Sequence, residues 1–336
     1  MAKNVPIKVG TSVINPGERA TVRLPVADLY TGTSLAMPVH VVCGRRDGPT
    51  LFVSAAIHGD ELNGVEIIRR LLKRKVLSAM RGTLLAVPIV NVHGFLDQSR
   101  YLPDRRDLNR SFPGSRKGSV ASRMAYTFMH EIVDKSDFGI DLHTGALNRC
   151  NLPQVRGNLD DEATLQLAKA FGAPVIIDSN ARDGSLRQCA ADKGMPMLIY
   201  EAGEALRFDE LSIRAGLRGT LNAMRHIGML PLSKKTSTAA PVVADSTSWV
   251  RAPESGIVVP RVELGSRVTE GQVLAVIGDP VSDEEAQVTA PFDGIVIGHS
   301  KLPLAHEGDA LFHIAAFKSV SRAENRVEEF AAVHGA

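Results

Sequence analysis

The segment "LFVSAAIHGDELNGVEIIRRLL", residues 51–72, indicates the class of fold. Its first part, "LFVSAAI", is a continuous apolar run of the kind found in strands that are buried on both faces of a sheet. From Gly64 onward, apolar residues recur at helical spacing with basic residues between them. His58 and Glu61 lie between the two patterns. A buried strand that leads directly into an amphipathic helix is the start of a βαβ unit, so we expect an α/β protein.

The same alternation of strand and helix patterns continues as far as residue 228. Strands are predicted at 83–92, 138–142, 174–178 and 196–203, and helices at 119–133, 161–172, 186–194 and 209–228. Helices that alternate with strands cover both faces of a sheet. We therefore expect a mixed, mostly parallel sheet with helices on both faces.

The remaining segments suggest a division into domains. Residues 1–48 combine alternating runs with turn residues and predict an N-terminal β segment that packs on a catalytic domain at 49–230. Residues 231–248 are rich in Pro, Ser, Thr and Ala and predict a linker. Residues 249–318 contain two similar halves of short strands and glycine turns, which predict a small all-β barrel or sandwich. Residues 319–336 form a charged tail, expected to be a short or frayed helix.

Composition excludes several functional classes. The 336 residues are 44% hydrophobic and 23% charged, with a formal net charge of +2. A balance so close to neutral does not favour a nucleic-acid or anionic-membrane partner. No run approaches the roughly 20 apolar residues of a membrane span, and the first ten residues do not resemble a secretory signal. Three cysteines without metal-type spacing favour a reducing compartment, so we expect a cytoplasmic protein. A homo-oligomer is compatible with the sequence, which does not fix the oligomeric state.

Polar side chains gather at the ends of the predicted strands. Ligands of open α/β sheets bind beyond the carboxyl ends of the strands, where His58, His143 and Glu201 are placed. Two histidines and one glutamate form a known ligand set for catalytic zinc, and His58, Glu61 and His143 fit it. Asp141 precedes His143 by two residues, on the same face of the strand, and could accept the other N–H of that ring. The alternative is a loop histidine beside a glutamate that opens a helix; the conjunction of these residues favours the metal site.

The same residues suggest hydrolytic chemistry. Zinc can lower the pKa of a bound water to about 7, and Glu201 could accept the proton and deliver it to a leaving nitrogen. Glu204 and Glu61 are alternatives for that base. The planar fork of Arg110 suits a carboxylate, although "DRRDLNR" (104–110) could also be a solvated loop with surface ion pairs. Arg187 could reach the site from a later loop.

Four motifs resemble one family when they are taken together. "HGDE" (58–61), "DLNRSFPG" (107–114), "DLHTG" (141–145) and "YEAGE" (200–204) occur in the order found in the succinylglutamate desuccinylase/aspartoacylase family. Members are zinc amidohydrolases with a carboxypeptidase-like fold, and the C-terminal β domain also resembles theirs. The resemblance therefore implies a zinc-carboxypeptidase-like catalytic domain.

The resemblance also implies roles for individual residues. It places one zinc ion per chain on His58, Glu61 and His143, and makes Glu201 the catalytic glutamate. It assigns Asn109 and Arg110 to the substrate carboxylate and neighbouring polar groups. A further family arginine, which polarises the scissile carbonyl, corresponds to Arg100 or Arg105. We prefer Arg100, because "SRYLPD" (99–104) leads into the same loop.

The C-terminal β domain has a second resemblance, to lipoyl and biotinyl carrier domains. Carrier domains display a lysine at a hairpin tip, whereas the connection between the two halves here, "GDPVSDEEAQVTAP" (278–291), contains no lysine. We therefore expect a structural cap that narrows the cleft, and no carrier role.

The sequence thus predicts a zinc-dependent deacylase that hydrolyses the linear amide of a small N-acylated amino acid or similar amide. The acyl group and the amino acid remain open. The closest alternative is a metallocarboxypeptidase that acts on short peptides, because it uses the same set of residues. A third alternative, from a different class, is a binding protein of the same fold without catalysis.

Overall fold

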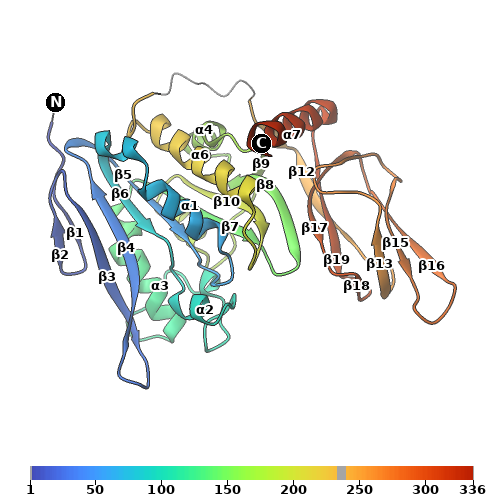
Figure 1. Cartoon of the computed structure of the whole chain (residues 1–336), viewed down its shortest axis with the longest axis horizontal. Helices are drawn as coiled ribbons and strands as arrows, with labels where there is room; N and C mark the ends of the chain where they lie inside the picture. The colour runs from blue at the N-terminus through green and yellow to red at the C-terminus, as the bar shows by residue number, and fades with distance from the viewer. Residues whose placement is uncertain (1, 233–239, 336) are drawn as a thin grey trace.

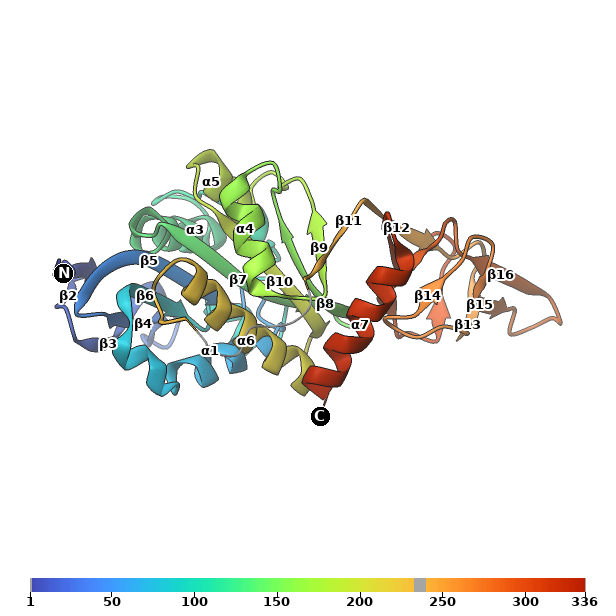
Figure 2. The same ribbon diagram turned by 90° about the horizontal axis from the view of Figure 1, so that it is seen from above.

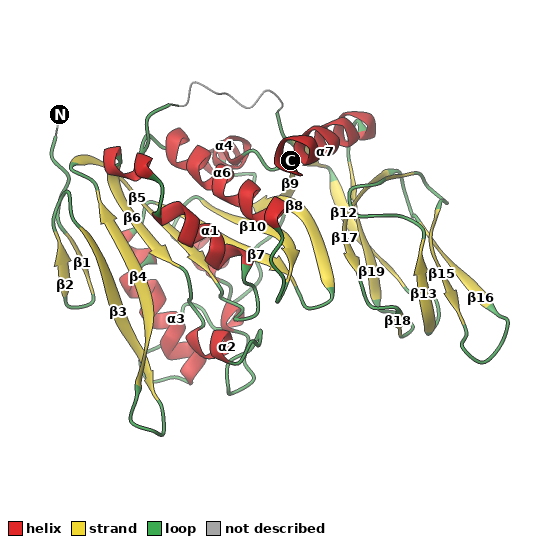
Figure 3. Cartoon of the chain, in the orientation of Figure 1, coloured by secondary structure: helices red, strands yellow, loops and turns green. Residues whose placement is uncertain are grey.

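The computed structural model describes residues 2–232 and 240–335 (Figure 1). Within this part of the chain, seven α-helices surround or flank the sheets (Figure 3). Their bounds are α1 (Asn63–Leu72), α2 (Val92–Leu96), α3 (Val120–Glu131), α4 (Glu162–Phe171), α5 (Leu186–Asp192), α6 (Glu210–His226) and α7 (Val320–Gly335). Short 3₁₀ turns are η1 (Lys75–Ala79), η2 (Leu108–Arg110) and η3 (Val133–Lys135).

The described strands form one large sheet and two small ones. The large sheet contains β3 (Arg19–Asp28), β4 (Ser34–Cys43), β5 (Arg46–Ala55), β6 (Arg81–Val87), β7 (Phe138–Gly145), β8 (Arg149–Gly157), β9 (Val175–Asp178), β10 (Met197–Glu204), β11 (Val242–Ala244), β12 (Ser246–Arg251), β14 (Arg267–Val268), β17 (Gly294–Ser300) and β19 (Ala310–Ala316). A four-stranded sheet contains β13 (Gly256–Pro260), β15 (Val273–Gly278), β16 (Glu285–Thr289) and β18 (Leu304–Ala305), and β1 (Ile7–Val9) pairs with β2 (Ser12–Ile14).

The large sheet is mixed, as expected, but only some of its neighbouring strands are parallel. Parallel ladders join β6, β5, β7 and β10 in the middle, and β8, β9 and β11 at one side. All other ladders of the sheet among the described residues are antiparallel. The prediction of a mostly parallel sheet is therefore wrong for the whole sheet, and holds only for the four central strands and for β8, β9 and β11 at one side. Of these antiparallel ladders, only β3 and β4 join consecutive strands as a hairpin; the others pair strands that are not consecutive in the chain.

Helices cover both faces of this sheet, and each face has its own core. On one face, α1, α4 and α6 bury residues such as Ile67, Phe171 and Ile213. On the other, α3 and α5 bury Phe128 and Leu186. Because both faces are covered, the central strand β5 can be apolar along its whole inner length, as its sequence pattern indicated.

The C-terminal strands are divided between the large sheet and the separate four-stranded sheet. β17 pairs with β8 of the catalytic part, so the large sheet continues without a break from β3 to β12. The four-stranded sheet packs against this extension through a shared apolar core that includes Val258, Ile277, Val296 and Ile314. The expected β sandwich is thus present, but one of its two layers belongs to the large sheet.

The structure differs from the predicted domain division at three places, where helices or strands are present that the sequence pattern did not indicate. The boundary at residue 48 falls inside β5. In the predicted linker, residues 233–239 lie outside the described part of the chain, while Val242–Ala244 form β11, paired with β9. The predicted tail is not frayed over its described residues. Most of it is α7, which buries Phe330 in the main core and crosses from α6 to β17 (Figure 2).

A nine-residue strand of the catalytic part was also missed. β8 reads "RCNLPQVRG" (149–157), and its proline and polar residues conceal an otherwise buried strand. It lies between β10 and β17 and so joins the catalytic part to the C-terminal strands. No helix among the described residues is long and apolar enough to cross a membrane.

Candidate active site

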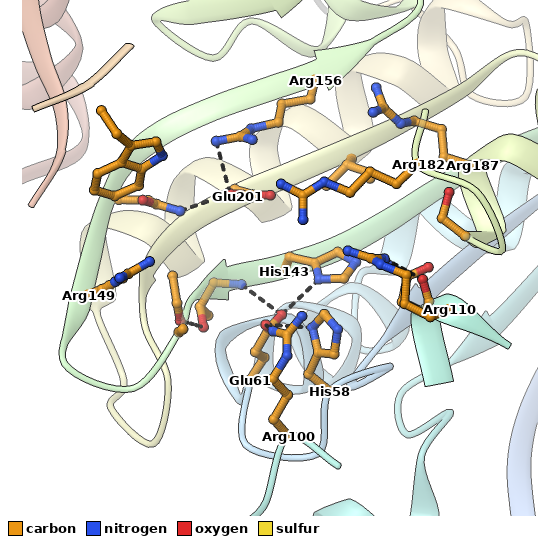
Figure 4. Close-up of a pocket in the computed structure, with 18 residues that line it drawn as sticks. His58, Glu61, Arg100, Arg110, His143, Arg149, Arg156, Arg182, Arg187 and Glu201 are labelled. Atoms are coloured by element: carbon orange, nitrogen blue, oxygen red, sulfur yellow. Dashed lines mark hydrogen bonds and ion pairs between the residues drawn. The ribbon is translucent and has the colours of Figure 1, made fainter. Parts of the chain in front are cut away.

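A cavity of about 330 Å³ opens at the carboxyl ends of β5, β7 and β10. Its floor is formed by His58, Glu61 and His143 (Figure 4). His58 follows β5, Glu61 lies two residues before the start of α1, and His143 lies near the end of β7. Since β5 and β7 are parallel neighbours, their ends bring residues 58 and 143 to one edge of the sheet, as the sequence indicated.

The three floor residues are close enough to share a metal ion. One ligand atom from each lies within 4.8 Å of the others. The Glu61 carboxylate reaches both rings, with Oε1 2.7 Å from His58 Nδ1 and Oε2 2.8 Å from His143 Nδ1. All three side chains are buried. Two imidazoles and one carboxylate that converge at a buried point match the donor chemistry of a catalytic zinc site.

The ionisable side chains of the floor shift one another's pKa values. Burial by itself would raise the pKa of Glu61, but the two adjacent histidines outweigh it and hold that pKa far below its usual range. Burial would lower the pKa of His143, whereas Asp141 and Glu61 raise it well above the ordinary value. The backbone N–H of Thr144 also donates to Glu61 Oε2 at 3.1 Å. Glu61 is therefore a carboxylate ready to act as a ligand.

A second layer of contacts orients the floor residues. His143 Nε2 lies 2.7 Å from Asp141 Oδ2, and Ser54 Oγ donates to Asp141 Oδ1 at 2.7 Å. This is the carboxylate–histidine arrangement that fixes ring orientation at metal sites. His58 Nε2 lies 3.3 Å from Asp107 Oδ1. The position of Asp141 was predicted from strand alternation, whereas the contribution of Asp107 was not.

The loop that carries His58 and Glu61 is fixed by close packing at Gly59. A Cβ atom at this position would lie 1.9 Å from the carbonyl carbon of Gly94 in α2. No other residue type fits without a backbone shift, because real Cβ contacts are never so short. The glycine in "HGDE" thus allows the loop to pack directly on α2, and this packing positions His58 and Glu61.

The loop at residues 99–110 supplies one wall of the cavity. Arg100 lines it, with Nη1 3.5 Å from Glu61 Oε1 and Nη2 3.0 Å from Asp107 Oδ2. Arg105 is exposed and does not line it. The structure therefore brings the preferred arginine of the two, Arg100, to the floor.

Asn109 and Arg110 also line the cavity, from η2. Asn109 Oδ1 accepts a hydrogen bond from Leu186 N at 3.0 Å, which ties η2 to the start of α5. The Arg110 guanidinium donates to the carbonyl of Asn109. Burial lowers the pKa of Arg110, and repulsion from Arg182 and Arg100 acts in the same direction, while Asp107 opposes it. Arg110 is therefore a cation in surroundings that favour an incoming anion.

Glu201 faces the floor from β10 (Figure 4). It pairs in register with His143 on the adjacent parallel strand. Asn151 Nδ2 donates to its Oε2 at 2.8 Å, and Arg156 Nη2 lies 3.4 Å from the same oxygen. Of the alternatives for the base, Glu204 pairs with Lys301 at 2.8 Å and does not line the cavity. Glu61 belongs to the floor group, so Glu201 is the carboxylate left to face it.

Several lining residues were not foreseen from the sequence. Arg149, Asn151 and Arg156 come from the missed strand β8, and Trp249 comes from β12 in the C-terminal part. Arg182 lies in the loop after β9. Arg187, considered from the sequence, does line the cavity, but its guanidinium donates to Ser179 and Asn180 at 2.7–2.8 Å. The only indication of β8 in the sequence was that the residues between the predicted strand at 138–142 and the predicted helix at 161–172 had no assigned structure.

Comparisons with known proteins agree with this site. Residues 47–227, just over half of the chain, match the family model described as the succinylglutamate desuccinylase/aspartoacylase catalytic domain. The chain is 28% identical over 306 residues to the N-alpha-acetyl-L-2,4-diaminobutyric acid deacetylase of Halomonas elongata, which covers 87% of this chain and 90% of that protein.

Solved structures of the same kind superimpose over almost the whole chain. A succinylglutamate desuccinylase/aspartoacylase from Rhodobacter sphaeroides has a TM-score of 0.80 at 25% identity, covering 89% of this chain and 95% of that one. The ectoine utilization protein EutE (DoeB) from Ruegeria pomeroyi, in a product-bound structure, has a TM-score of 0.82 at 23% identity, covering 93% and 99%. The resemblance inferred from the four motifs is thereby confirmed: the chain belongs to the succinylglutamate desuccinylase/aspartoacylase family.

Proposed function

We propose that the protein is a zinc-dependent hydrolase that cleaves the amide bond of a small N-acylated amino acid. The observation that carries the proposal is the convergence of His58, Glu61 and His143 within 4.8 Å, with Glu201 facing them in the same cavity. The relative from Halomonas elongata is named as a deacetylase of an N-acetyl amino acid, which supports the substrate class.

The donor set fits zinc, with His58, Glu61 and His143 as the residues that would hold one ion. When bound there, zinc supplies a Lewis acid and lowers the pKa of a water molecule in the site to about 7. In our proposal Glu201 would accept a proton from a water molecule that attacks the acyl carbon. It then delivers the proton to the nitrogen as the C–N bond breaks, so a carboxylic acid and an amine are released. Asn151 and Arg156 keep the carboxylate of Glu201 in place for both transfers.

Arg100, Asn109 and Arg110 have binding roles in this proposal. Arg100 lies beside Glu61 and is placed to stabilise negative charge that develops on the carbonyl oxygen. Asn109 and Arg110 hold the carboxylate of the amino acid, which fixes the amide over the floor. Asp141 keeps the ring of His143 in its ligating orientation.

A metallocarboxypeptidase would use the same floor, so the shape of the cavity matters. Trp249, supplied by the C-terminal strand β12, lines one side of a cavity of only about 330 Å³. A cavity of that size lies at the small end of the range for ligand sites. It suits one acyl group and one amino acid better than an extended peptide. Hydrolysis of N-acyl amino acids, and none of unblocked di- to tetrapeptides, is the expected outcome of a substrate panel.

Arg110→Ala is expected to lower kcat/KM for substrates that carry a free carboxylate. Charge-assisted hydrogen bonds contribute about 1.5–3 kcal/mol, which corresponds to a ten- to hundredfold loss in kcat/KM. The corresponding amino-acid amides lack the negative charge and should lose much less. The measurement is kcat/KM for a matched acid and amide in both proteins.

Arg105→Ala is the matched control, because Arg105 belongs to the same loop but is exposed outside the cavity. This variant should leave kcat/KM unchanged for both the acid and the amide. Equal losses for acid and amide in Arg110→Ala would show that Arg110 does not recognise the carboxylate.

A further inference from the structure

A second cavity lies beside the C-terminal helix, away from the active site. Its volume of about 330 Å³ equals that of the active-site cavity. Three helices line it, namely the end of α4, the second half of α6, and α7, which crosses α6 (Figure 2). In the described part of the chain, no residue that lines one cavity also lines the other. The cavity between these helices is therefore separate from the site at the carboxyl ends of the strands.

Arg326 of α7 lines this cavity and is a buried cation without an acidic partner. Only 7% of its surface is exposed. Its Nη2 donates to the carbonyl of Gly172 at 3.1 Å, while its Nε is buried and has no hydrogen-bond partner among the described residues. Burial lowers the pKa of Arg326, and the charge of Glu329 opposes this only in part. A buried charge is costly unless an anion compensates it.

Arg218 of α6 brings a second positive charge to the same cavity. Its side chain is exposed and forms no hydrogen bond or ion pair with any residue that the structure describes. The neighbouring His334 reflects the positive potential of both arginines. Burial lowers the pKa of His334, and repulsion from Arg218 and Arg326 acts in the same direction. His334 is therefore neutral near pH 7, and the two arginines are the cations that face a ligand.

The other walls of the cavity are mostly apolar. The rings of Phe171 and Phe330 line it, together with small residues of α6 such as Ala215. Phe330 stacks on His334 with ring centres 4.2 Å apart, and the guanidinium carbon of Arg326 lies 5.6 Å from the centre of the Phe330 ring. Cations thus lie next to aromatic faces. A space of this volume, at the small end of the range for ligand sites, accommodates one ring with a short acidic side chain.

We propose that the cavity between α4, α6 and α7 is a second ligand site, which takes an organic anion with a ring-sized apolar body, such as an aromatic carboxylate. The anionic group pairs with Arg326 and Arg218, and the apolar body packs on Phe171 and Phe330. The ligand supplies the counter-charge that buried Arg326 lacks. Because α7 packs on both α6 and β17, a bound ligand also stabilises the attachment of the C-terminal strands to the catalytic part. The site goes beyond the proposed deacylase function and does not depend on it.

Calorimetric titration of the full-length protein with phenylacetate tests the site. Phenylacetamide has the same size without the charge, and acetate has the charge without the ring. The native protein should bind phenylacetate at least about tenfold more tightly than either, since each lacks one of the two expected contacts. Arg218→Met should weaken the binding of phenylacetate by at least about tenfold. Arg218 has no partner among the described residues, so this variant should fold normally.

Two control variants separate this site from other positions that could bind a carboxylate. Arg322 is exposed on the same helix, α7, and does not line the cavity, so Arg322→Met should leave the affinity for phenylacetate unchanged. Arg110→Ala, in the active-site cavity, should also leave it unchanged. Weaker binding to Arg110→Ala, with native affinity in Arg218→Met, would place phenylacetate in the active site and overturn the proposal.

Thermal unfolding gives a second readout that includes Arg326. Arg326→Met is expected to lower Tm by itself, because it removes the donor to the carbonyl of Gly172, so the comparison is the change in Tm that the ligand causes. Phenylacetate should raise the Tm of the native protein and of Arg322→Met. The increase should be much smaller for Arg218→Met and Arg326→Met. No binding to the native protein, equal affinity for phenylacetamide, or an equal rise in Tm in all four proteins would contradict the second site.

Discussion

Replacing Glu201 with glutamine is expected to lower kcat by about 10²–10⁴-fold, the usual contribution of a general acid–base group. Glutamine has the same size and can still accept a hydrogen bond, but it cannot take a proton from water. Because Glu201 faces the floor without belonging to the cluster that could hold a metal, the variant should keep its zinc. The loss should therefore appear in kcat, with little change in KM.

Glu204→Gln is the matched control for this prediction. Glu204 lies on the same strand, pairs with Lys301 and does not line the cavity. Its replacement should leave kcat within a few-fold of the native value. A Glu201→Gln protein with native kcat would exclude Glu201 as the proton carrier, and loss of zinc from that protein would make Glu201 a ligand instead.

His143→Ala is expected to remove zinc and hydrolysis together. A catalytic site with three protein ligands has none to spare, so two remaining ligands should not retain the ion at micromolar protein concentrations. The change also leaves Glu61 and Asp141 buried without one of their positive partners, and stranding a buried charge typically costs ~3–5 kcal/mol. We therefore expect a lower Tm as well as a zinc content near zero by elemental analysis.

His93→Ala separates the loss of a ligand from the loss of a buried histidine. His93 lies in α2, its Nε2 is buried, and it does not line the cavity. This variant should retain full zinc. If His143→Ala fails to fold, His58→Ala tests the same set, since it removes a different ligand. One zinc ion per chain in a folded His143→Ala protein would remove His143 from the metal site.

The residues of the floor could be predicted because local pattern and sheet geometry are enough to place them. His58 and His143 of the floor, and Glu201 that faces it, lie near the carboxyl ends of strands, and the carboxyl ends of adjacent parallel strands meet at one edge. Asp141 followed from strand alternation. These inferences needed no knowledge of how distant segments pack.

The residues that shape the rest of the cavity could not be predicted in this way. β8 is largely buried but lines a polar cavity, so Asn151 and Arg156 interrupt the apolar alternation that reveals a strand. The approach of Trp249 to Arg149 depends on β17 pairing with β8, a contact between segments about 150 residues apart. Tertiary pairing of this kind leaves no local signal in either segment.

The central claim, metal-dependent amide hydrolysis, is tested most directly by titrating zinc into metal-stripped protein while the release of free amine from N-acylated amino acids is followed. The account predicts no turnover without metal, and a rate that rises in proportion to bound zinc and reaches its limit at one ion per chain. Turnover that persists in the metal-free protein, or no turnover of any acylated amino acid with one zinc bound, would contradict it.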